Sequence, residues 1–392
     1  MSAGRLLGDP GAVLAHAGGA PSVLAHAGGA PSGLAPLPLL LLAATGAVAA
    51  VAALVAHRSP ATPGPGLLLP PALTQAADGR AARLALRLAG TAGAAALLVS
   101  AVLGSPALAA RAANIALFDF WAWLAVASLL LGPVWRLVNP FRAQLLRLSG
   151  DAVRPPPSGL GWWPAAAGLL ATAWVALVLP GRPLVFVVLI AVLTLVQLGG
   201  VAVYGPRWLD LGDPLEAYSA VLGAVAPVRR TAQGRLHLAS PRHRLATLAA
   251  PPGTAAVCGA LIGWYAADAI VETETWHAIT FPAGSLLIAR SAVLLACAAA
   301  VGLLAAATTS RRGLAPALLP IAAGWALGHH LAPLAPAVSL AGLVAGHLGA
   351  IVVAHDRAVA RYGARAAAAQ LELRALVLTL LVAGLALRYG GL

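Results

Sequence analysis

Metal-ligating side chains gather in three short segments of the second half of the chain: VETETWHAIT, GWALGHH and GLVAGH. The candidate ligands are Glu272, Glu274, His277, His329, His330 and His347. Imidazole and carboxylate groups together suit Zn²⁺, Mn²⁺ or Cu²⁺, and such a cation could activate a water for hydrolysis. We predict a metal site here. The alternative is that isolated histidines hydrogen-bond between helices and the glutamates are solvated, because no HExxH or other fixed spacing occurs.

Four further ionisable residues could line a polar path instead: Asp119, Asp268, His355 and Asp356. Ionisable groups inside a membrane are costly and usually mark a site or a pathway. Asp119 has a second interpretation, because the sequence around it is FDFWAW. A belt of aromatic side chains at a membrane interface with one solvated aspartate fits that stretch equally well.

The phrase VLAHAGGAPS occurs twice within residues 13–32, and His16 and His26 are its only ionisable groups. If a signal were cleaved just before either histidine, the new terminal amine and the imidazole could chelate Cu²⁺. Residues 1–12 are too short and glycine-rich to supply the apolar core of roughly 7–15 residues that a secretory signal needs. Either translation starts upstream, or the tail crosses the membrane uncleaved. The duplication itself favours repeat expansion over a second selected site.

Several other chemistries find no support in the sequence. Cys258 and Cys297 lie singly in apolar segments, which is typical of small buried side chains rather than of a disulfide or a CxxC site. With Met1 as the single methionine, a soft copper(I) site is excluded. Ser285 has no GxSxG context, and no phosphate-binding glycine loop occurs.

The composition requires a membrane. Hydrophobic residues make up 60% of the 392-residue chain and charged residues only 9%, whereas soluble domains carry roughly 25% charged residues. A backbone in lipid must satisfy its own hydrogen bonds, and the Ala/Leu-rich sequence favours helices over a barrel. We therefore predict an all-α integral membrane protein. The formal net charge of +13 then indicates loops at an anionic inner leaflet, and no nucleic-acid partner.

Ten stretches are apolar over roughly the 20 residues that a spanning helix needs. They are residues 35–56, 86–105, 114–136, 162–180, 183–204, 254–271, 286–307, 314–333, 336–355 and 372–390. All 25 cationic side chains are arginines. In a ten-span topology twenty of them fall on one side, and Arg5, Arg111, Arg182 and Arg388 fall on the other. Because arginine is enriched in cytoplasmic loops, both termini are predicted outside.

The spans divide the chain into four parts. We predict a flexible extracytoplasmic tail over 1–34, a five-helix half over 35–204, a cytoplasmic loop over 205–253 and a second five-helix half over 254–392. In the loop, Asp213 and Pro214 form an N-cap and first-turn pair. The apolar spacing from Leu215 to Val225 predicts a short amphipathic helix on the inner membrane surface, followed by a basic stretch. A docking site for a soluble partner is the alternative for this loop.

Five segments in order carry a family resemblance: LAHAGGAPSGLAPLPLLLL, LVNPFR, VYGPRWLDLGDPLEAYSAVLGAVAPV, LAPALLPIAAGWALGHHLA and AGHLGAIVVAHDRAVARY. Together they resemble the actinobacterial multi-pass membrane proteins that carry the name fenitrothion hydrolase. The resemblance implies organophosphate ester hydrolysis at a cell membrane. His329, His347 and the pair His355–Asp356 match the family pattern. Relatives have a histidine early in the eighth span, where this chain has Pro316, and that departure weakens the metal hypothesis.

Two functional hypotheses stay open. One is a membrane-embedded metallohydrolase with an outward-facing His/carboxylate site. The other is a transporter, or a membrane subunit for metal or envelope handling, in which the same polar residues line a path without covalent chemistry. Hydrolysis needs a closed site with an activated water, whereas the spacing of His329, His347 and His355 through the membrane favours a path. Both hypotheses place the chain in the plasma membrane, where a membrane partner subunit could join it.

Overall fold

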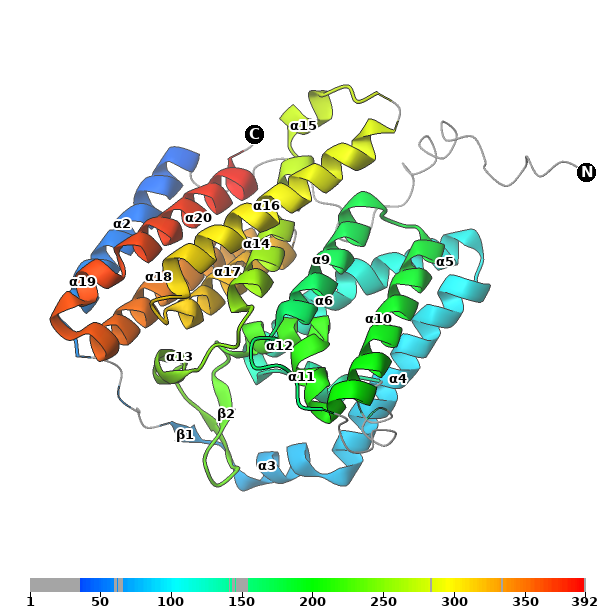
Figure 1. Cartoon of the computed structure of the whole chain (residues 1–392), viewed down its shortest axis with the longest axis horizontal. Coiled ribbons are helices and arrows are strands. Elements are labelled where there is room, and N and C mark those ends of the chain that lie inside the picture. The colour runs from blue at the N-terminus through cyan, green and yellow to red at the C-terminus, as the bar shows by residue number, and fades with distance from the viewer. Residues whose placement is uncertain are drawn as a thin grey trace, which may run out of the picture.

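The computed structural model describes residues 36–390, apart from residues 60, 61, 63–65, 141, 143, 144, 146–153, 283 and 333. The duplicated tail with His16 and His26 lies outside the described residues. Helices dominate the remainder, and each of the ten apolar stretches contains one (Figure 1). The helices of these stretches, together with α5 that leads into α6, are α2 (Leu37–Ala56), α4 (Arg80–Leu103), α5 (Pro106–Asn114), α6 (Phe120–Leu131), α9 (Trp163–Val178), α10 (Pro183–Tyr204), α14 (Thr254–Val271), α16 (Ser285–Thr309), α17 (Leu318–Leu331), α18 (Pro336–Tyr362) and α20 (Leu371–Tyr389).

Within the described part of the chain, seven continuous helical stretches are long and apolar enough to cross a membrane. They are Leu37–Ala56, Arg80–Leu103, Pro106–Leu131, Pro183–Gly223, Thr254–Val271, Ser285–Thr309 and Pro336–Ala369. At 16 and 14 residues, α9 and α17 are shorter than the roughly 20 residues of a full span. The chain is a polytopic helical membrane protein. The count of ten spans and the outward termini stay predictions.

Short elements connect the long helices. They are α3 (Pro71–Asp78), a π-helical turn (Ile115–Asp119), α7 (Trp135–Val138), α11 (Trp208–Gly212), α12 (Pro214–Gly223), α13 (Arg242–Thr247), α15 (Glu274–Ala278), α19 (Ala366–Ala369) and three 3₁₀ turns at Gly205–Arg207, Ala315–Ala317 and Gly363–Arg365. A small antiparallel sheet has the order β1 (Leu67–Leu68), β3 (Leu236–Leu238), β2 (Val228–Arg230). Its central strand pairs Leu238 with both Leu67 and Val228.

The central helix of the bundle is α14, of which sixteen of eighteen residues are buried. It packs against α9, α16, α17 and α20. A Cβ atom at Gly259 would lie 2.6 Å from Gly302 of α16, and one at Gly263 would collide with Ala298. The two helices therefore approach each other at a distance that only small side chains permit, which is how membrane helices gain packing energy in lipid.

Two G-x-x-x-G segments, Gly324–Gly328 on α17 and Gly342–Gly346 on α18, pack against each other where these helices cross. A Cβ atom at Gly324 would lie 3.0 Å from the carbonyl oxygen of Gly342, and one at Gly346 would collide with Pro320. At the far end of this contact the Ser339 hydroxyl donates to the carbonyl oxygen of Gly328, at 3.0 Å. The close crossing fixes the last turn of α17, which carries His329 and His330.

The short helix in the 205–253 loop forms where it is predicted but lies in a different place. Asp213 caps α12 by accepting from the backbone N–H groups of Leu215 and Glu216, at 2.9 and 3.2 Å. Eight of its ten residues are buried, however, and it packs against α6, α9 and α17. Because its alanine, serine and glycine side chains are small, all sides of α12 fit inside the bundle rather than one side lying on the surface.

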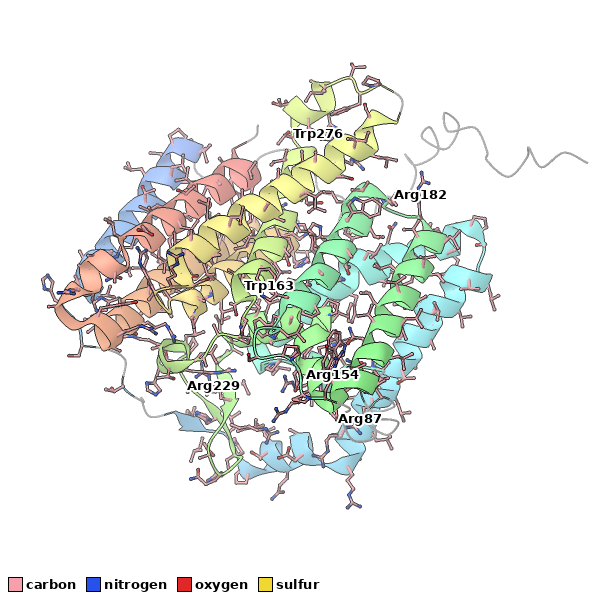
Figure 2. The ribbon with its side chains drawn as sticks, viewed as in Figure 1. Arg87, Arg154, Trp163, Arg182, Arg229 and Trp276 are labelled. Atoms are coloured by element: carbon pink, nitrogen blue, oxygen red, sulfur yellow. The ribbon has the colours of Figure 1, made fainter. Side chains whose placement is uncertain are left out.

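Arginines mark one end of the molecule. Figure 2 shows Arg87, Arg154 and Arg229 toward one end, and Arg182 and Trp276 toward the opposite end. We call the first the arginine-rich end and the second the arginine-poor end. The sheet, α3 and α13 lie at the arginine-rich end, and α15 lies at the other (Figure 1). This is the charge asymmetry that positive-inside topologies produce.

Candidate functional site

Six polar or ionisable side chains meet inside the bundle, and we call them the central cluster. They are Tyr218 on α12, Tyr265 and Asp268 on α14, His329 and His330 on α17, and Arg388 on α20. The two tyrosines are completely buried, and the side chain of Arg388 is only 9% exposed. Four helices that are distant in sequence thus contribute side chains to one buried polar site.

Asp268, His329 and Arg388 form the charged part of the cluster. Oδ2 of Asp268 lies 3.5 Å from Nδ1 of His329 and 3.7 Å from Nη2 of Arg388. Arg388 also donates from Nη2 to Nδ1 of His329 and, at 3.0 Å, to the backbone carbonyl of Tyr265. The arginine therefore faces three acceptors, and none of them holds it in a bidentate fork.

The protonation state of His329 follows from these contacts. Arginine can only donate, so the Nδ1 atom facing Arg388 accepts and the ring is the neutral tautomer with its proton on Nε2. If Nδ1 gained a proton, it could no longer accept from Arg388, and Asp268 at 3.5 Å would become its acceptor. The geometry thus places a donor, Arg388, and an acceptor, Asp268, beside the same nitrogen of this histidine.

His330 carries the cluster toward α12. Its Nε2 atom lies 3.1 Å from the hydroxyl of Tyr218 and 3.4 Å from the hydroxyl of Tyr265, and Tyr265 donates to Tyr218 at 3.4 Å. The Tyr218 hydroxyl also reaches the backbone carbonyl of Trp121, at 3.2 Å. The hydroxyls of two tyrosines, on α12 and α14, therefore meet at one imidazole nitrogen of α17.

Aromatic rings enclose the cluster. The ring of His329 stacks on Tyr265 with the centroids 4.6 Å apart, and His330 meets His329 edge-on at 4.7 Å. Trp264 packs edge-on against Trp121 at 5.4 Å. Such contacts fix the ring orientations and exclude water from the histidines.

The six predicted metal ligands do not converge. Within the described residues, no group of three or more His, Cys, Asp or Glu side chains could hold a metal ion. Glu272, Glu274 and His277 are exposed at the arginine-poor end, around α15, whereas His329 and His330 are buried. The zinc, manganese or copper site therefore stays a prediction without support from this arrangement.

His347 lies apart from the charged part of the cluster, on α18. It is completely buried, and its Nδ1 donates to the carbonyl oxygen of Leu343 one turn earlier, at 2.7 Å. Its Nε2 atom has no hydrogen-bond partner among the described residues. A neutral imidazole bonded to its own helix fits the interpretation of an isolated buried histidine.

His355 and Asp356 lie two turns further along α18, at the arginine-rich end. Asp356 is completely buried and accepts two hydrogen bonds from Arg242, both 2.7 Å long. This pairing raises the pKa of the Arg242 guanidinium above its usual value. Nε2 of His355 lies 3.2 Å from the carbonyl oxygen of Arg58. The pair ties α13 to α18 rather than continuing a path from the central cluster.

Asp119 ends the π-helical turn that joins α5 to α6, and its side chain is half-buried. Of the two tryptophans near it, one is buried and the other is exposed. Trp121 is buried against the central cluster, whereas Trp123 is 74% exposed on the lipid-facing side of α6. The exposed tryptophan matches an interfacial belt, and the buried one belongs to the site.

A second polar network surrounds α12 near the arginine-rich end. The Asp213 carboxylate accepts from Trp135 Nε1 at 2.9 Å and from Asn139 Nδ2 at 2.8 Å. Glu216 pairs with Arg136, and Ser219 shares a 2.8 Å hydrogen bond with Ser128. These contacts hold the buried helix in place through its polar side chains.

Sequence reasoning missed Tyr218, Tyr265 and Arg388 as site residues. Arg388 did carry a signal, because it is one of the few arginines on the arginine-poor side and follows an apolar run. The signal at Tyr218 was misleading, because the apolar spacing from Leu215 to Val225 predicted a helix on the membrane surface. Nothing in the spacing of Tyr265 distinguishes it from a core aromatic residue.

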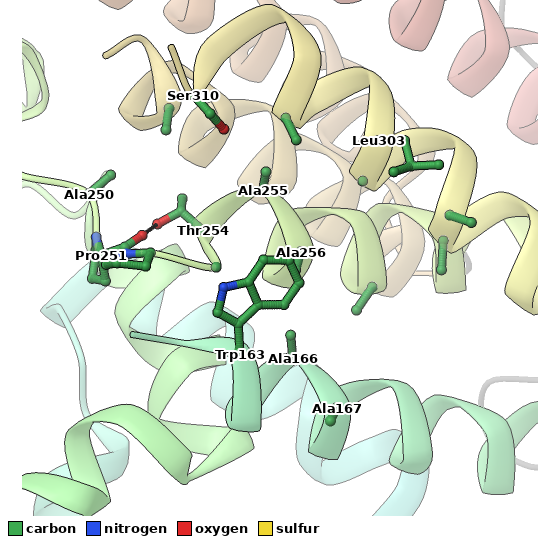
Figure 3. Close-up of a pocket in the computed structure, with 18 of the residues that line it drawn as sticks. Trp163, Ala166, Ala167, Ala250, Pro251, Thr254, Ala255, Ala256, Leu303 and Ser310 are labelled. Carbon is green, nitrogen blue, oxygen red and sulfur yellow. Dashed lines mark hydrogen bonds between the residues drawn. The ribbon is translucent and has the colours of Figure 1, made fainter. Parts of the chain in front are cut away.

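Among the described residues, cavities open between the helices, and two of them are large enough for a small molecule. The first, of about 860 Å³, lies between α9, α14 and α16. Figure 3 shows Trp163 pointing into it opposite Ala255 and Ala256, with Leu303 on α16 and Ser310 directly after the end of that helix. The second, of about 740 Å³, lies between α4, α6 and α10 and includes Trp121 in its wall.

The fold and the central cluster define a polytopic helical membrane protein with a buried ionisable site. No family model matches this chain, and no curated protein and no solved structure is similar to it. The resemblance to the fenitrothion hydrolase family and the hydrolytic activity it implies therefore gain no support beyond that membrane class.

Proposed function

We propose that this protein moves protons across the plasma membrane, with the central cluster as the proton-binding relay. The observation that carries the proposal is the position of His329 Nδ1 between the donor Arg388 and the acceptor Asp268. Histidine is the side chain whose charge changes most readily near neutral pH. Buried histidine and aspartate inside membrane bundles are the residues that proton relays use.

Polar and ionisable side chains continue from the central cluster toward both ends of the bundle. On the arginine-poor side, Asp268 lies in the last turn of α14, and the exposed Glu272 follows that helix directly. On the other side, the His330–Tyr218 contact reaches α12. There the next residue, Ser219, bonds to Ser128, and Glu216 pairs with the half-exposed Arg136. This series of groups supports transfer between the two ends.

The proposal includes an orientation. The arginine-rich end faces the cytoplasm and its anionic leaflet, because arginine is retained there. Ten spans with both termini outside are consistent with a helix in each apolar stretch, provided that the shorter α9 and α17 are extended by their flanking turns. A membrane partner subunit belongs to the same proposal.

A flux assay with the full chain in liposomes tests the function. A pH-sensitive dye is enclosed, and a potassium diffusion potential is imposed with valinomycin. We expect acidification at a rate several times that of protein-free liposomes. We expect Asp268→Asn to reduce the protein-dependent rate by at least about tenfold, because loss of one essential proton-transfer group typically costs that factor or more.

The matched control is Glu372→Gln, which makes the same chemical change at an exposed carboxylate paired with Arg312. Its rate should equal that of the unchanged protein. Equal rates for Asp268→Asn and the unchanged protein would show that protons do not pass through the central cluster. A rate no higher than that of empty liposomes would overturn proton translocation itself.

A further inference from the structure

The cavity between α9, α14 and α16 joins an apolar wall to a charged end. Leu295, Ala299 and Leu303 recur at helical spacing on α16 and form part of the wall. The two leucines are 51% and 71% exposed, so the cavity borders the lipid-facing surface of that spanning helix. Trp163 of α9 points into it (Figure 3). Among the described residues that line the cavity, Arg357 alone is charged.

Arg357 lies directly after Asp356, at the arginine-rich end. Its Nε donates to the carbonyl oxygen of Gly313 at 2.7 Å, and its Nη1 donates to three carbonyl oxygens at the end of α13, at 2.8–3.1 Å. All of these acceptors are neutral, and the adjacent carboxylate of Asp356 is paired with Arg242. Nη2 makes no hydrogen bond within the described residues, yet it is not one of their buried unpaired atoms, so it stays accessible. The guanidinium therefore offers a ligand in the cavity an uncompensated charge and a free donor.

Other groups at this end of the cavity also favour an anion. Nη1 of Arg361, one turn further along α18, lies 2.6 Å from the place that a Cβ atom of Gly313 would take in the cavity wall. The first turn of α14 contributes Ala255 and Ala256, whose N–H groups have no backbone partner within the described residues. The start of a helix attracts negative charge. Among the described lining residues there is no aspartate or glutamate to oppose it.

We infer that this cavity binds an anionic phospholipid of the inner leaflet, with its phosphate accepting from Nη2 of Arg357 and one acyl chain along the apolar face of α16. Basic pockets between membrane helices on the cytoplasmic side suit such heads, and a volume of about 860 Å³ is in the range of ligand-binding cavities. A head with an ammonium group fits less well, because no carboxylate of the described lining would face it. The site is independent of proton translocation, and only its assignment to the inner leaflet rests on the orientation proposed above.

Native mass spectrometry of the full chain in detergent tests the site. The probes are palmitoyl-oleoyl phosphatidylglycerol and palmitoyl-oleoyl phosphatidylcholine, which share their chains and differ in the head. We expect the first phosphatidylglycerol to bind with roughly five times the affinity of phosphatidylcholine, the usual contribution of one arginine facing an anionic head. Arg357→Gln should remove this preference. Arg80→Gln, at an exposed arginine that does not line the cavity, should keep it. Equal loss in both variants would assign the binding to general surface charge and overturn the site.

Because Arg357 also holds the end of α13, a second pair of variants leaves it unchanged. Ala299→Phe fills the cavity, whereas Ala300→Phe places the same ring at an exposed neighbour that does not line it. We expect the first variant alone to bind phosphatidylglycerol severalfold more weakly, and thermal unfolding checks that both are folded. Equal binding by the two would overturn the site. Equal affinity of the unchanged protein for both lipids would overturn the anionic head. Displacement of phosphatidylglycerol by millimolar inorganic phosphate would overturn the lipid and identify a free anion as the ligand.

Discussion

The Arg242–Asp356 pair and the central cluster both place charge inside the same bundle, but their hydrogen bonding differs. Asp356 accepts both of its 2.7 Å bonds from one guanidinium, in a bidentate fork. Asp268 instead lies 3.5 Å from His329 and 3.7 Å from Arg388, whose Nη2 also serves His329 and a backbone carbonyl. A bidentate pair holds one arrangement, whereas competing partners permit several. The first is suited to anchoring helices and the second to moving a proton.

Removing the negative charge at Asp356 should produce the largest loss of stability. Asp356→Asn leaves Arg242 facing a buried neutral amide, and breaking a hydrogen-bonded buried pair typically costs roughly 2–5 kcal/mol. Thermal unfolding of the purified protein, followed by tryptophan fluorescence, measures the change. Proton flux of the surviving folded protein should be normal. The exposed Arg312–Glu372 pair is the control, and Glu372→Gln should leave the unfolding temperature unchanged.

The same substitution in the central cluster should have a smaller effect on stability. In Asp268→Asn, Arg388 keeps its bonds to the Tyr265 carbonyl and to His329, so we expect a loss of about 1–3 kcal/mol. The same unfolding measurement applies. If Asp268→Asn proves as destabilising as Asp356→Asn, then Asp268 is a structural partner of Arg388, and the contrast between the two regions fails.

The smallest loss of stability is expected at Tyr218. Tyr218→Phe removes the hydroxyl that reaches His330 but keeps the ring that packs on Trp121, so the free energy of unfolding should fall by about 0.5–1.5 kcal/mol. The proton flux in liposomes should nevertheless fall severalfold. A fall in stability with unchanged flux would separate α12 from the relay and confine proton handling to Asp268, His329 and Arg388.

Local sequence patterns located much of the architecture. Each apolar stretch contains a helix, and the N-cap predicted at Asp213 is confirmed. Helix formation and capping depend on neighbours a few residues apart, so the local sequence is sufficient for them. The predicted surface location of α12 was wrong. A short helix of small and apolar residues can lie either on the membrane surface or inside the bundle, and the helices packed around it decide between the two.

The candidate site was predicted only in part. Asp268, His329 and His330 were identified by their residue types within apolar segments, but their partners Tyr218, Tyr265 and Arg388 were not. Each partner comes from a different part of the chain, and spacing along the sequence carries no information about which helices will be neighbours. The six predicted metal ligands illustrate the same problem. Only the predicted ten-span topology placed the exposed glutamates near the buried histidines.

The sequence by itself determined that this protein is a helical membrane protein with arginines concentrated at one end. The helical fold follows from the cost of leaving polar backbone groups unpaired in lipid, and the arginine asymmetry follows from the enrichment of arginine in cytoplasmic loops. The tertiary structure alone decided that α12 lies inside the bundle and that Arg388 faces Asp268 and His329. These features depend on which helices pack together, and helix packing is decided by the shapes of whole surfaces rather than by any local pattern.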